Sequence, residues 1–299
     1  NELKENIIQN GLILGRNRSA VLTQDISYRK ACSLKNSCLW GCENDSIYNA
    51  VYDLNRLIEF PNFHYMPGFF IEKFYKQDIG YKIIGFEKNN NNNISFFSEK
   101  VCVAAGTIGS TILVSKTLKK YNYPHKIICH PSFAFPLIVP QSIGKLLSEK
   151  NFSLGQLAYR INYTNSEYAF GSLFTAEGIL ASDLASYMPA TRPTSVLVSK
   201  VLIPSMLLAN CYLPGKYSDC TIEIKNSGYN SEVLLKGGYT LDFEEKMKWA
   251  VKKLKRGFRK LGAYIIPASV TVSKLGSDAH YVGTIPMTDK SSGLSCTKY

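Results

Sequence analysis

The stretch between residues 68 and 120 restricts the fold more than any other part of the sequence. It contains four runs with the composition of β-strands, at 68–76, 81–87, 94–97 and 100–104. A turn ending in Gly80 separates the first two runs, and five consecutive Asn residues separate the second from the third. The fourth run is apolar without alternation, which is typical of a strand buried on both faces. Because Gly106 and a helix-length segment follow, we predict a β-meander that leads into a buried strand and then a helix.

The segment from Lys126 to Lys236 has a different composition, with frequent aromatic residues and prolines. Its extended runs lie at 127–129, 135–139, 157–163, 168–174, 196–203 and 220–225. Short helices are expected at 141–149 and 181–187, and another helix is expected upstream, at 45–58. This pattern predicts a mainly antiparallel sheet with short helices.

A basic amphipathic helix is predicted between residues 242 and 261. Its apolar residues recur at spacings of three and four: Phe243, Met247, Val251, Leu254, Phe258 and Leu261. Asp242 and Glu245 form an N-cap signature, and Gly262 is placed to end the helix. The chain has a net charge of +12, and much of it is concentrated here. We interpret the basic stripe as a solvated outer face, and since no zinc-finger, RNP or Gly-x-x-Gly element accompanies this helix, we predict no nucleic-acid partner. The alternative is a surface for polynucleotides or anionic membranes.

The size and composition of the chain define its broad class. Its 299 residues are 45% hydrophobic, which is enough for one large domain or two interleaved domains. No run of about 18 apolar residues occurs, so we expect no transmembrane segment. The eight cysteines are mostly scattered and do not have the spacing of a disulfide framework, which favours a reducing, cytoplasmic location.

Three cysteines are clustered. Cys32, Cys38 and Cys42 lie within eleven residues, and thiolates at short spacing can hold an iron–sulfur cluster. A structural cysteine loop and a zinc site that lacks its fourth ligand remain open as alternatives.

Three blocks of the sequence carry a resemblance to a known family. They are CSLKNSCLWGCENDSIYNA (32–50), VCVAAGTIGSTILVSKTL (101–118) and GSDAHYVGTIPM (276–287). Together they resemble the glucose–methanol–choline (GMC) family of FAD-dependent oxidoreductases, in which a strand-to-helix segment lies beside the FAD and a His-x-x-Gly-Thr block lies near the C-terminus. The order and spacing of the blocks are similar to those of the family across most of the chain.

The resemblance implies a fold, a cofactor and a set of site residues. The fold class is α/β plus α+β: a partial FAD-binding domain of the two-dinucleotide-fold type (1–125) with a β-meander, a substrate domain with a mainly antiparallel sheet (126–271), and a return to the FAD domain (272–299). The residues implied to lie beside the FAD are Phe70, Ala104, Ala105 and Gly106. His280 is implied to be the catalytic base, and the competing interpretation is a structural histidine.

The implied reaction is oxidation of a CH–OH group of a sugar, polyol or other alcohol, with hydride transfer to the flavin. If the cysteine cluster holds iron, a dehydrogenase is favoured over an oxidase; the electron acceptor is not identified. The alternative is a non-catalytic remnant of the same fold that binds a saccharide or a partner protein.

The sequence departs from the family pattern in three places. The Gly-x-Gly-x-x-Gly fingerprint that cradles the FAD phosphates is absent from these 299 residues, and we expect it upstream of Asn1. The family's final segment, with a second catalytic His or Asn, is expected downstream of Tyr299. Lys35 stands where many relatives have a fourth cysteine of the cluster. We therefore expect the chain to be an incomplete piece of such an enzyme.

Overall fold

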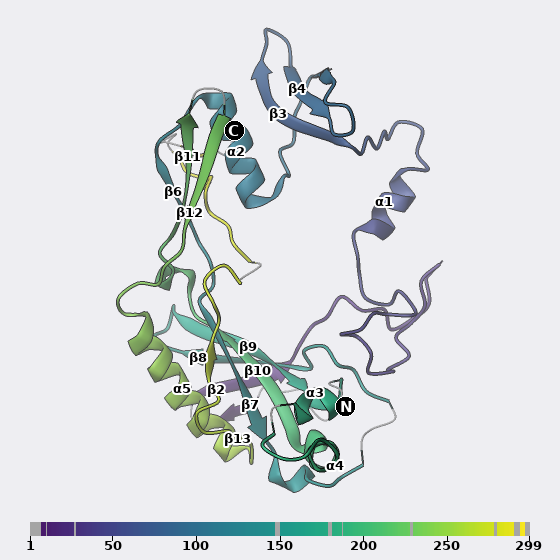
Figure 1. Cartoon of the computed structure of the whole chain (residues 1–299), viewed down its shortest axis with the longest axis vertical. Helices are drawn as coiled ribbons and strands as arrows, with labels where there is room; N and C mark the ends of the chain where they lie inside the picture. The colour runs from purple at the N-terminus through teal and green to yellow at the C-terminus, as the bar shows by residue number, and fades with distance from the viewer. Residues whose placement is uncertain are drawn as a thin grey trace. The chain divides into compact units, whose positions relative to one another are not determined.

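The computed structural model shows a mixed α/β protein with mainly antiparallel sheets (Figure 1). It describes residues 7–9, 11–26, 28–146, 150–178, 181–186, 188–227, 230–277, 280–289 and 294–296. The chain forms two compact units, and each is built from three separate segments. Unit 1 contains residues 1–54, 131–214 and 242–274, and unit 2 contains residues 55–130, 215–241 and 275–299. Within the described residues, no helix is long and apolar enough to cross a lipid bilayer.

Unit 1 is organised around one large antiparallel sheet. Its strand order is β1 (Ile7–Gln9), β2 (Leu12–Arg16), β8 (Leu157–Asn162), β9 (Tyr168–Thr175), β10 (Met206–Tyr212), β7 (Ser132–Ile138) and β13 (Tyr264–Ile265), and β14 (Thr271–Val272) also pairs with β7. Side chains alternate across the pleat, so that Phe133, Phe135 and Leu137 of β7 are fully buried. The antiparallel sheet predicted for this part of the chain is therefore confirmed.

Helix α5 (Phe243–Lys260) covers one face of this sheet and contacts β2, β8 and β13 (Figure 1). Its buried residues are Phe243, Ala250, Leu254, Gly257 and Phe258, which form the apolar face expected from their spacing. The Phe258 ring lies 5.5 Å from the Tyr159 ring and 6.2 Å from the Phe135 ring. The prediction of an amphipathic helix is confirmed.

Apart from α2 (Gly106–Leu118), the remaining described helices have at most 11 residues. Helix α1 (Val51–Leu57) buries none of its residues and occupies only part of the predicted helix at 45–58. Unit 1 also contains α3 (Ala181–Ala185) and α4 (Arg192–Leu202). Single turns of 3-10 helix lie at Pro140–Ser142 (η1), Ala176–Gly178 (η2), Ile203–Ser205 (η3) and Gly215–Tyr217 (η4).

The described part of unit 2 is built mainly from two three-stranded antiparallel sheets and the helix α2. The predicted meander is present as β3 (Phe69–Lys76), β4 (Tyr81–Glu87) and β5 (Asn93–Ser98). The second sheet is formed by β12 (Asn230–Lys236), β11 (Cys220–Ser227) and β6 (Pro124–Ile127). Helix α2 (Gly106–Leu118) packs Ile108 and Ile112 against the isoleucines of this second sheet. The helix expected after Gly106 is thus confirmed.

Two predicted strands are wrong. Residues 101–104 are irregular, with Cys102 and Ala104 exposed, so the buried strand does not form. A short apolar run becomes a strand only where a neighbouring strand offers a ladder, and none pairs with it among the described residues. Residues 196–202 belong to α4. This helix buries Ser195 and Ser199 and exposes Leu197, Val198 and Val201, so its hydrophobic pattern is inverted and misled the sequence interpretation.

Other predicted boundaries also shifted. The extended run at 127–129 is represented by β6, which ends at Ile127 because Ile128 pairs only as an isolated bridge with Val282. Of the helix predicted at 141–149, only the turn Pro140–Ser142 is helical, and residues 147–149 lie outside the described part of the chain. The helix predicted at 181–187 is α3, and residue 187 also lies outside the described part.

The two units divide the chain differently from the three functional segments expected from the family resemblance. Residues 1–54 belong to the same unit as residues 131–214, and residues 215–241 belong to the same unit as 55–130. The assignment of FAD-binding and substrate-binding roles to 1–125, 126–271 and 272–299 stays a prediction.

Candidate functional site

The first candidate site is the N-terminal end of α2 in unit 2. Gly106 has φ +72°, a left-handed conformation that favours glycine, and a Cβ atom built on it would meet no atom within 4 Å. Ala104, Ala105 and Gly106 are all exposed. Ala105, the N-cap residue, makes no side-chain hydrogen bond, and the first turn contains no acidic residue. The N-cap side chain therefore does not cap the first-turn N–H groups, which is a feature of helix starts that bind anions.

The segment containing His280 packs against this end of α2. The Thr107 hydroxyl donates a hydrogen bond of 2.6 Å to the carbonyl oxygen of Tyr281. One helical turn later, the hydroxyl oxygens of Thr111 and Thr284 lie 2.7 Å apart in a buried position. Tyr281 also packs against the isoleucine cluster of unit 2. Two blocks separated by about 170 residues are thus joined through threonine hydroxyls. These hydrogen bonds supply partners for polar groups that would destabilise the fold if they were buried unpaired.

A second connection fixes the turn after His280. Val282 and Ile128 exchange backbone hydrogen bonds of 2.8 and 3.0 Å. Gly283 has φ +92°, and a Cβ atom there would lie 2.9 Å from Ile128 Cδ1, so both its conformation and its surroundings require glycine. The following residue, Thr284, is buried. The turn behind His280 is therefore held by the backbone and by close packing.

His280 is exposed, and it immediately precedes Tyr281, whose carbonyl accepts the bond from α2. Asp278 and Ala279 of the same block lie outside the described residues. The role of His280 as the catalytic base stays a prediction.

Phe70, also expected beside the cofactor, lies on β3 in the same unit. Its side chain is 47% exposed and stacks on Phe86 with ring centroids 5.1 Å apart. Strand β3 is tied to α2 through the Phe74 N–H, which donates to Thr117 Oγ1 over 3.2 Å. Thr117 is at the opposite end of α2 from Gly106, so this bond does not bring Phe70 to the start of the helix.

The second candidate site is the cysteine loop of unit 1, defined here as residues 31–46. Cys32, Cys38 and Cys42 all line one small cavity of about 20 Å³. Four residues with positive φ wind the loop tightly: Leu34, Asn36, Gly41 and Asp45. The three predicted cysteines thus line the same small cavity of the loop.

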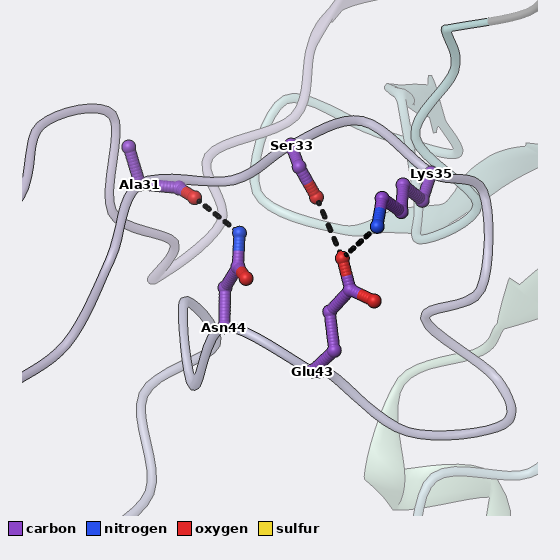
Figure 2. A network of polar contacts seen from close by, with 5 residues as sticks. All are labelled: Ala31, Ser33, Lys35, Glu43 and Asn44. Atoms are coloured by element: carbon purple, nitrogen blue, oxygen red, sulfur yellow. Dashed lines mark hydrogen bonds and ion pairs between the residues drawn. The ribbon is translucent and has the colours of Figure 1, made fainter.

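Side-chain contacts brace the two arms of the loop against each other (Figure 2). The Asn44 amide donates to the Ala31 carbonyl oxygen over 3.0 Å. Glu43 Oε1 accepts a hydrogen bond from the Ser33 hydroxyl at 3.4 Å and forms an ion pair with Lys35 Nζ at 2.5 Å. The hydrogen bond from Lys35 is the main cause that lowers the pKa of the Glu43 carboxyl. Lys35 therefore closes the loop with an ion pair to Glu43.

Backbone and side-chain bonds anchor the loop to the region around η2. Asn151 exchanges backbone hydrogen bonds with Leu34 and Asn36, at 2.8 and 3.1 Å. The Cys38 N–H donates to Ser153 Oγ over 3.1 Å, and the Trp40 indole N–H donates to the Gly178 carbonyl oxygen over 3.1 Å. The Asn151 side chain in turn donates to the Glu177 carboxylate. These partners are more than a hundred residues from the loop in sequence, so the loop is held by tertiary contacts.

Cys42 has a distinct electrostatic environment. Burial raises the pKa of its thiol, but backbone N–H groups, including that of Ser46 at 3.2 Å from Sγ, favour the thiolate and lower the pKa overall. Cys211 in the same unit is the opposite case, because burial raises the pKa of its thiol to about 12. Cys42 is therefore the better candidate for nucleophilic or ligating chemistry.

The arrangement of the three thiols does not match a metal centre. Within the described ranges, no three His, Cys, Asp or Glu side chains are placed to hold a metal ion. A cavity of about 20 Å³ has the size of a single water-sized ligand, and an iron–sulfur cluster is several times larger. As they lie, these residues do not fit the cluster, and iron–sulfur ligation stays a prediction without geometric support.

Sequence reasoning missed the residues that connect the blocks. Thr107 and Thr111 lie one turn apart on the same face of a predicted helix. This spacing could have indicated that both hydroxyls contact the same neighbouring segment. No comparable local signal exists for the bond between Trp40 and Gly178.

Comparison with known proteins adds no assignment, since no protein-family model matches the chain and no curated protein matches it either.

Proposed function

We propose that this chain belongs to an FAD-dependent oxidoreductase that oxidises a CH–OH group of a sugar, polyol or other alcohol, with His280 as the general base. Unit 2 then contributes part of an FAD-binding domain of the two-dinucleotide-fold type. The observation that carries the proposal is the contact between the Gly106–Thr111 turn of α2 and the His280–Thr284 segment. Both blocks resemble cofactor-facing parts of the GMC family, and the fold places them side by side.

The residues at the start of α2 fit a bound flavin nucleotide. Ala104, Ala105 and Gly106 are small and exposed, so a planar or phosphate-bearing group can approach the backbone closely. The uncapped N–H groups of the first turn can donate hydrogen bonds to its negatively charged or carbonyl oxygens. When bound there, FAD supplies the hydride acceptor for the reaction.

His280 supplies the acid–base chemistry in this proposal. Imidazole is the side chain best suited to accept a proton near neutral pH, and the substrate hydroxyl must lose its proton as the carbonyl forms. An exposed imidazole can reach a substrate, and the anchored turn behind it limits its movement. Preorganisation of this kind reduces the entropic cost of positioning the base.

The test is anaerobic flavin reduction in the natural full-length gene product, with a panel of sugars and alcohols as donors. His280→Ala should leave folding and flavin content nearly unchanged and slow flavin reduction by about 10²- to 10⁴-fold, the usual contribution of a general base. His64→Ala is the matched control, because His64 is also exposed and lies in none of the three blocks. Stopped-flow absorbance at the flavin band measures both variants.

Two results would overturn the proposal. One is a His280→Ala variant that reduces its flavin at the rate of the unmodified protein. The other is a full-length protein that folds, binds a saccharide and contains no flavin, which would identify the alternative, a non-catalytic member of the same fold. Absence of a Gly-x-Gly-x-x-Gly fingerprint upstream of Asn1 in the full gene would favour that alternative.

A further inference from the structure

We propose that a groove at the C-terminal half of α5 is a binding site for a small ligand that carries adjacent phosphate groups. The groove has a volume of about 650 Å³ and is lined by Lys253, Arg256, Arg259, Lys260 and Tyr264. All five residues belong to unit 1, so the site is formed within one compact unit. The inference is independent of the proposed oxidoreductase activity.

The charge at this groove is uncompensated. No acidic residue occurs between Lys246 and Ser277 in the sequence. Within the described part of the chain, the ion pairs of α5 involve only Lys246 and Lys248 near its N-terminal end. None of the four cations of the groove pairs with a carboxylate there, and Lys253 lies 5.6 Å above the Trp249 ring. A concave surface with four positive charges and no counter-charge attracts anions strongly.

Helix stability alone does not account for this arrangement. Cations in the last turn interact favourably with the helix dipole, which explains Arg259 and Lys260. The effect falls off beyond that turn, so it does not explain Lys253 or Arg256. Arg256 is also three residues from Arg259 and four from Lys260, and like charges at these spacings destabilise a helix. A bound anion would relieve this repulsion.

The chemistry of the lining favours phosphate. Two arginines present planar guanidinium groups that bind phosphate oxygens with paired hydrogen bonds, and the lysines add point charges. Tyr264 is 49% exposed and offers a hydroxyl donor and an aromatic ring at the edge of the groove. The volume lies in the range of small-molecule sites, about 300–1,000 Å³.

The packing of α5 and the size of the groove disfavour the two macromolecular alternatives, an anionic membrane and a nucleic acid. An amphipathic helix binds membranes by inserting its apolar face, but the apolar face of α5 is buried against the sheet. The stretch from Lys253 to Lys260 rises by about 10 Å, which matches a short chain of phosphates and covers only about three nucleotides of a strand. One aromatic residue lines the groove, whereas sites for single-stranded nucleic acids stack successive bases on several aromatic rings.

Isothermal titration calorimetry of the whole chain with inorganic tripolyphosphate, at low ionic strength, tests the proposal. We expect saturable binding with one site per chain, weakened at least about tenfold in the R256Q/R259Q variant, because charge-assisted hydrogen bonds are lost. The matched control is K252Q/K255Q, which removes the same charge from exposed positions of α5 outside the groove. The control should weaken binding less than about threefold, because charges outside the groove interact with the ligand only through long-range electrostatics that salt screens. Circular dichroism checks that both variants are folded.

Parallel titrations identify the source of the phosphate. ATP that binds more tightly than tripolyphosphate, with the difference lost in Tyr264→Ala, indicates a nucleotide; equal affinities indicate that the phosphate chain alone is recognised. Three outcomes would overturn the proposal: no saturable binding, equal losses in the two double variants, or oligonucleotide binding that tightens with length and is not displaced by tripolyphosphate. The last outcome would instead identify a nucleic-acid surface.

Discussion

The thiols of Cys42 and Cys211 lie in the same unit and have opposite environments. Backbone N–H groups around Cys42 stabilise its thiolate, whereas Cys211 is fully buried in β10 with a pKa of about 12. The difference arises from the local backbone: the tightly wound loop directs N–H groups at one sulfur, and the sheet surrounds the other with apolar side chains.

This difference predicts which cysteine reacts. A lowered pKa means that a larger fraction of Cys42 is thiolate at a given pH, so its alkylation by iodoacetamide should become fast at a lower pH than that of an ordinary thiol, and should be lost as the pH falls through the pKa of the folded protein. Cys211 should stay unmodified while the protein is folded. Peptide mapping by mass spectrometry as a function of pH measures both, with Cys42→Ser as the control. A reaction midpoint for Cys42 at or above that of a model peptide would contradict the prediction.

At the residue scale, sequence reasoning identifies what the local backbone requires. Gly106 could be identified as the turn residue before α2, because its positive φ favours glycine, whereas the roles of Ala104, Ala105 and Gly106 beside a cofactor stay predictions. The partners of the cysteine loop could not be identified, because the Trp40–Gly178 and Cys38–Ser153 bonds join residues 138 and 115 positions apart. No periodicity along the chain encodes such pairs.

Two helices of unit 1 show how far periodicity predicts an element. The predicted span of α5 differed by one residue at each end, because its apolar residues repeat with the helical period and a capping signature precedes them. Helix α4 was taken for a strand because its buried face contains Ser195 and Ser199, with Ser199 Oγ bonded to the Ser195 carbonyl oxygen. When small polar residues face the core, the hydrophobic pattern gives the wrong period.

The packing of α5 against the sheet depends on Gly257. A Cβ atom at this position would lie 2.7 Å from the Leu12 Cβ atom on β2. Alanine favours helix by about 1 kcal/mol over glycine, but overpacking a core costs about 1–3 kcal/mol. We therefore expect Gly257→Ala to lower the free energy of unfolding by up to about 2 kcal/mol, measured by urea denaturation followed by circular dichroism.

A double-mutant cycle separates the two effects. In a Leu12→Gly background the Cβ atom, and with it the close contact, is absent, so Gly257→Ala should become neutral or stabilising. If Gly257→Ala is equally destabilising in both backgrounds, the contact with Leu12 is not the cause.

For the whole molecule, the sequence predicted the kinds of structure but not how the segments combine. The meander, the antiparallel sheet and the basic helix each have local signatures. The division into two units, each assembled from three separate segments, depends on strand pairings between distant residues. Such pairings are selected by the complementarity of whole surfaces, which local patterns do not describe.

The absence of the glycine fingerprint leads to a prediction for the 299-residue chain. Without glycines that cradle the pyrophosphate, the helix start at Gly106 can contact only part of the cofactor. We therefore expect the purified chain to be colourless and to bind FAD weakly and substoichiometrically, as measured by absorbance and by fluorescence titration. A tightly bound, stoichiometric flavin would place the binding site elsewhere in the chain.

The pairing of β2 with β8 has a consequence during protein synthesis. The ribosome releases Leu12–Arg16 early, but the partner strand emerges only after residues 157–162 have been made, and the covering helix α5 emerges later still. In that interval Leu12 and Leu14, which are buried in the finished sheet, can pair with β1 but lack β8 and the covering helix, so the other edge of β2 is unpaired. Unpaired strand edges are the regions through which nascent chains associate with one another. A slower rate of translation lengthens this interval, and therefore acts against correct folding of unit 1.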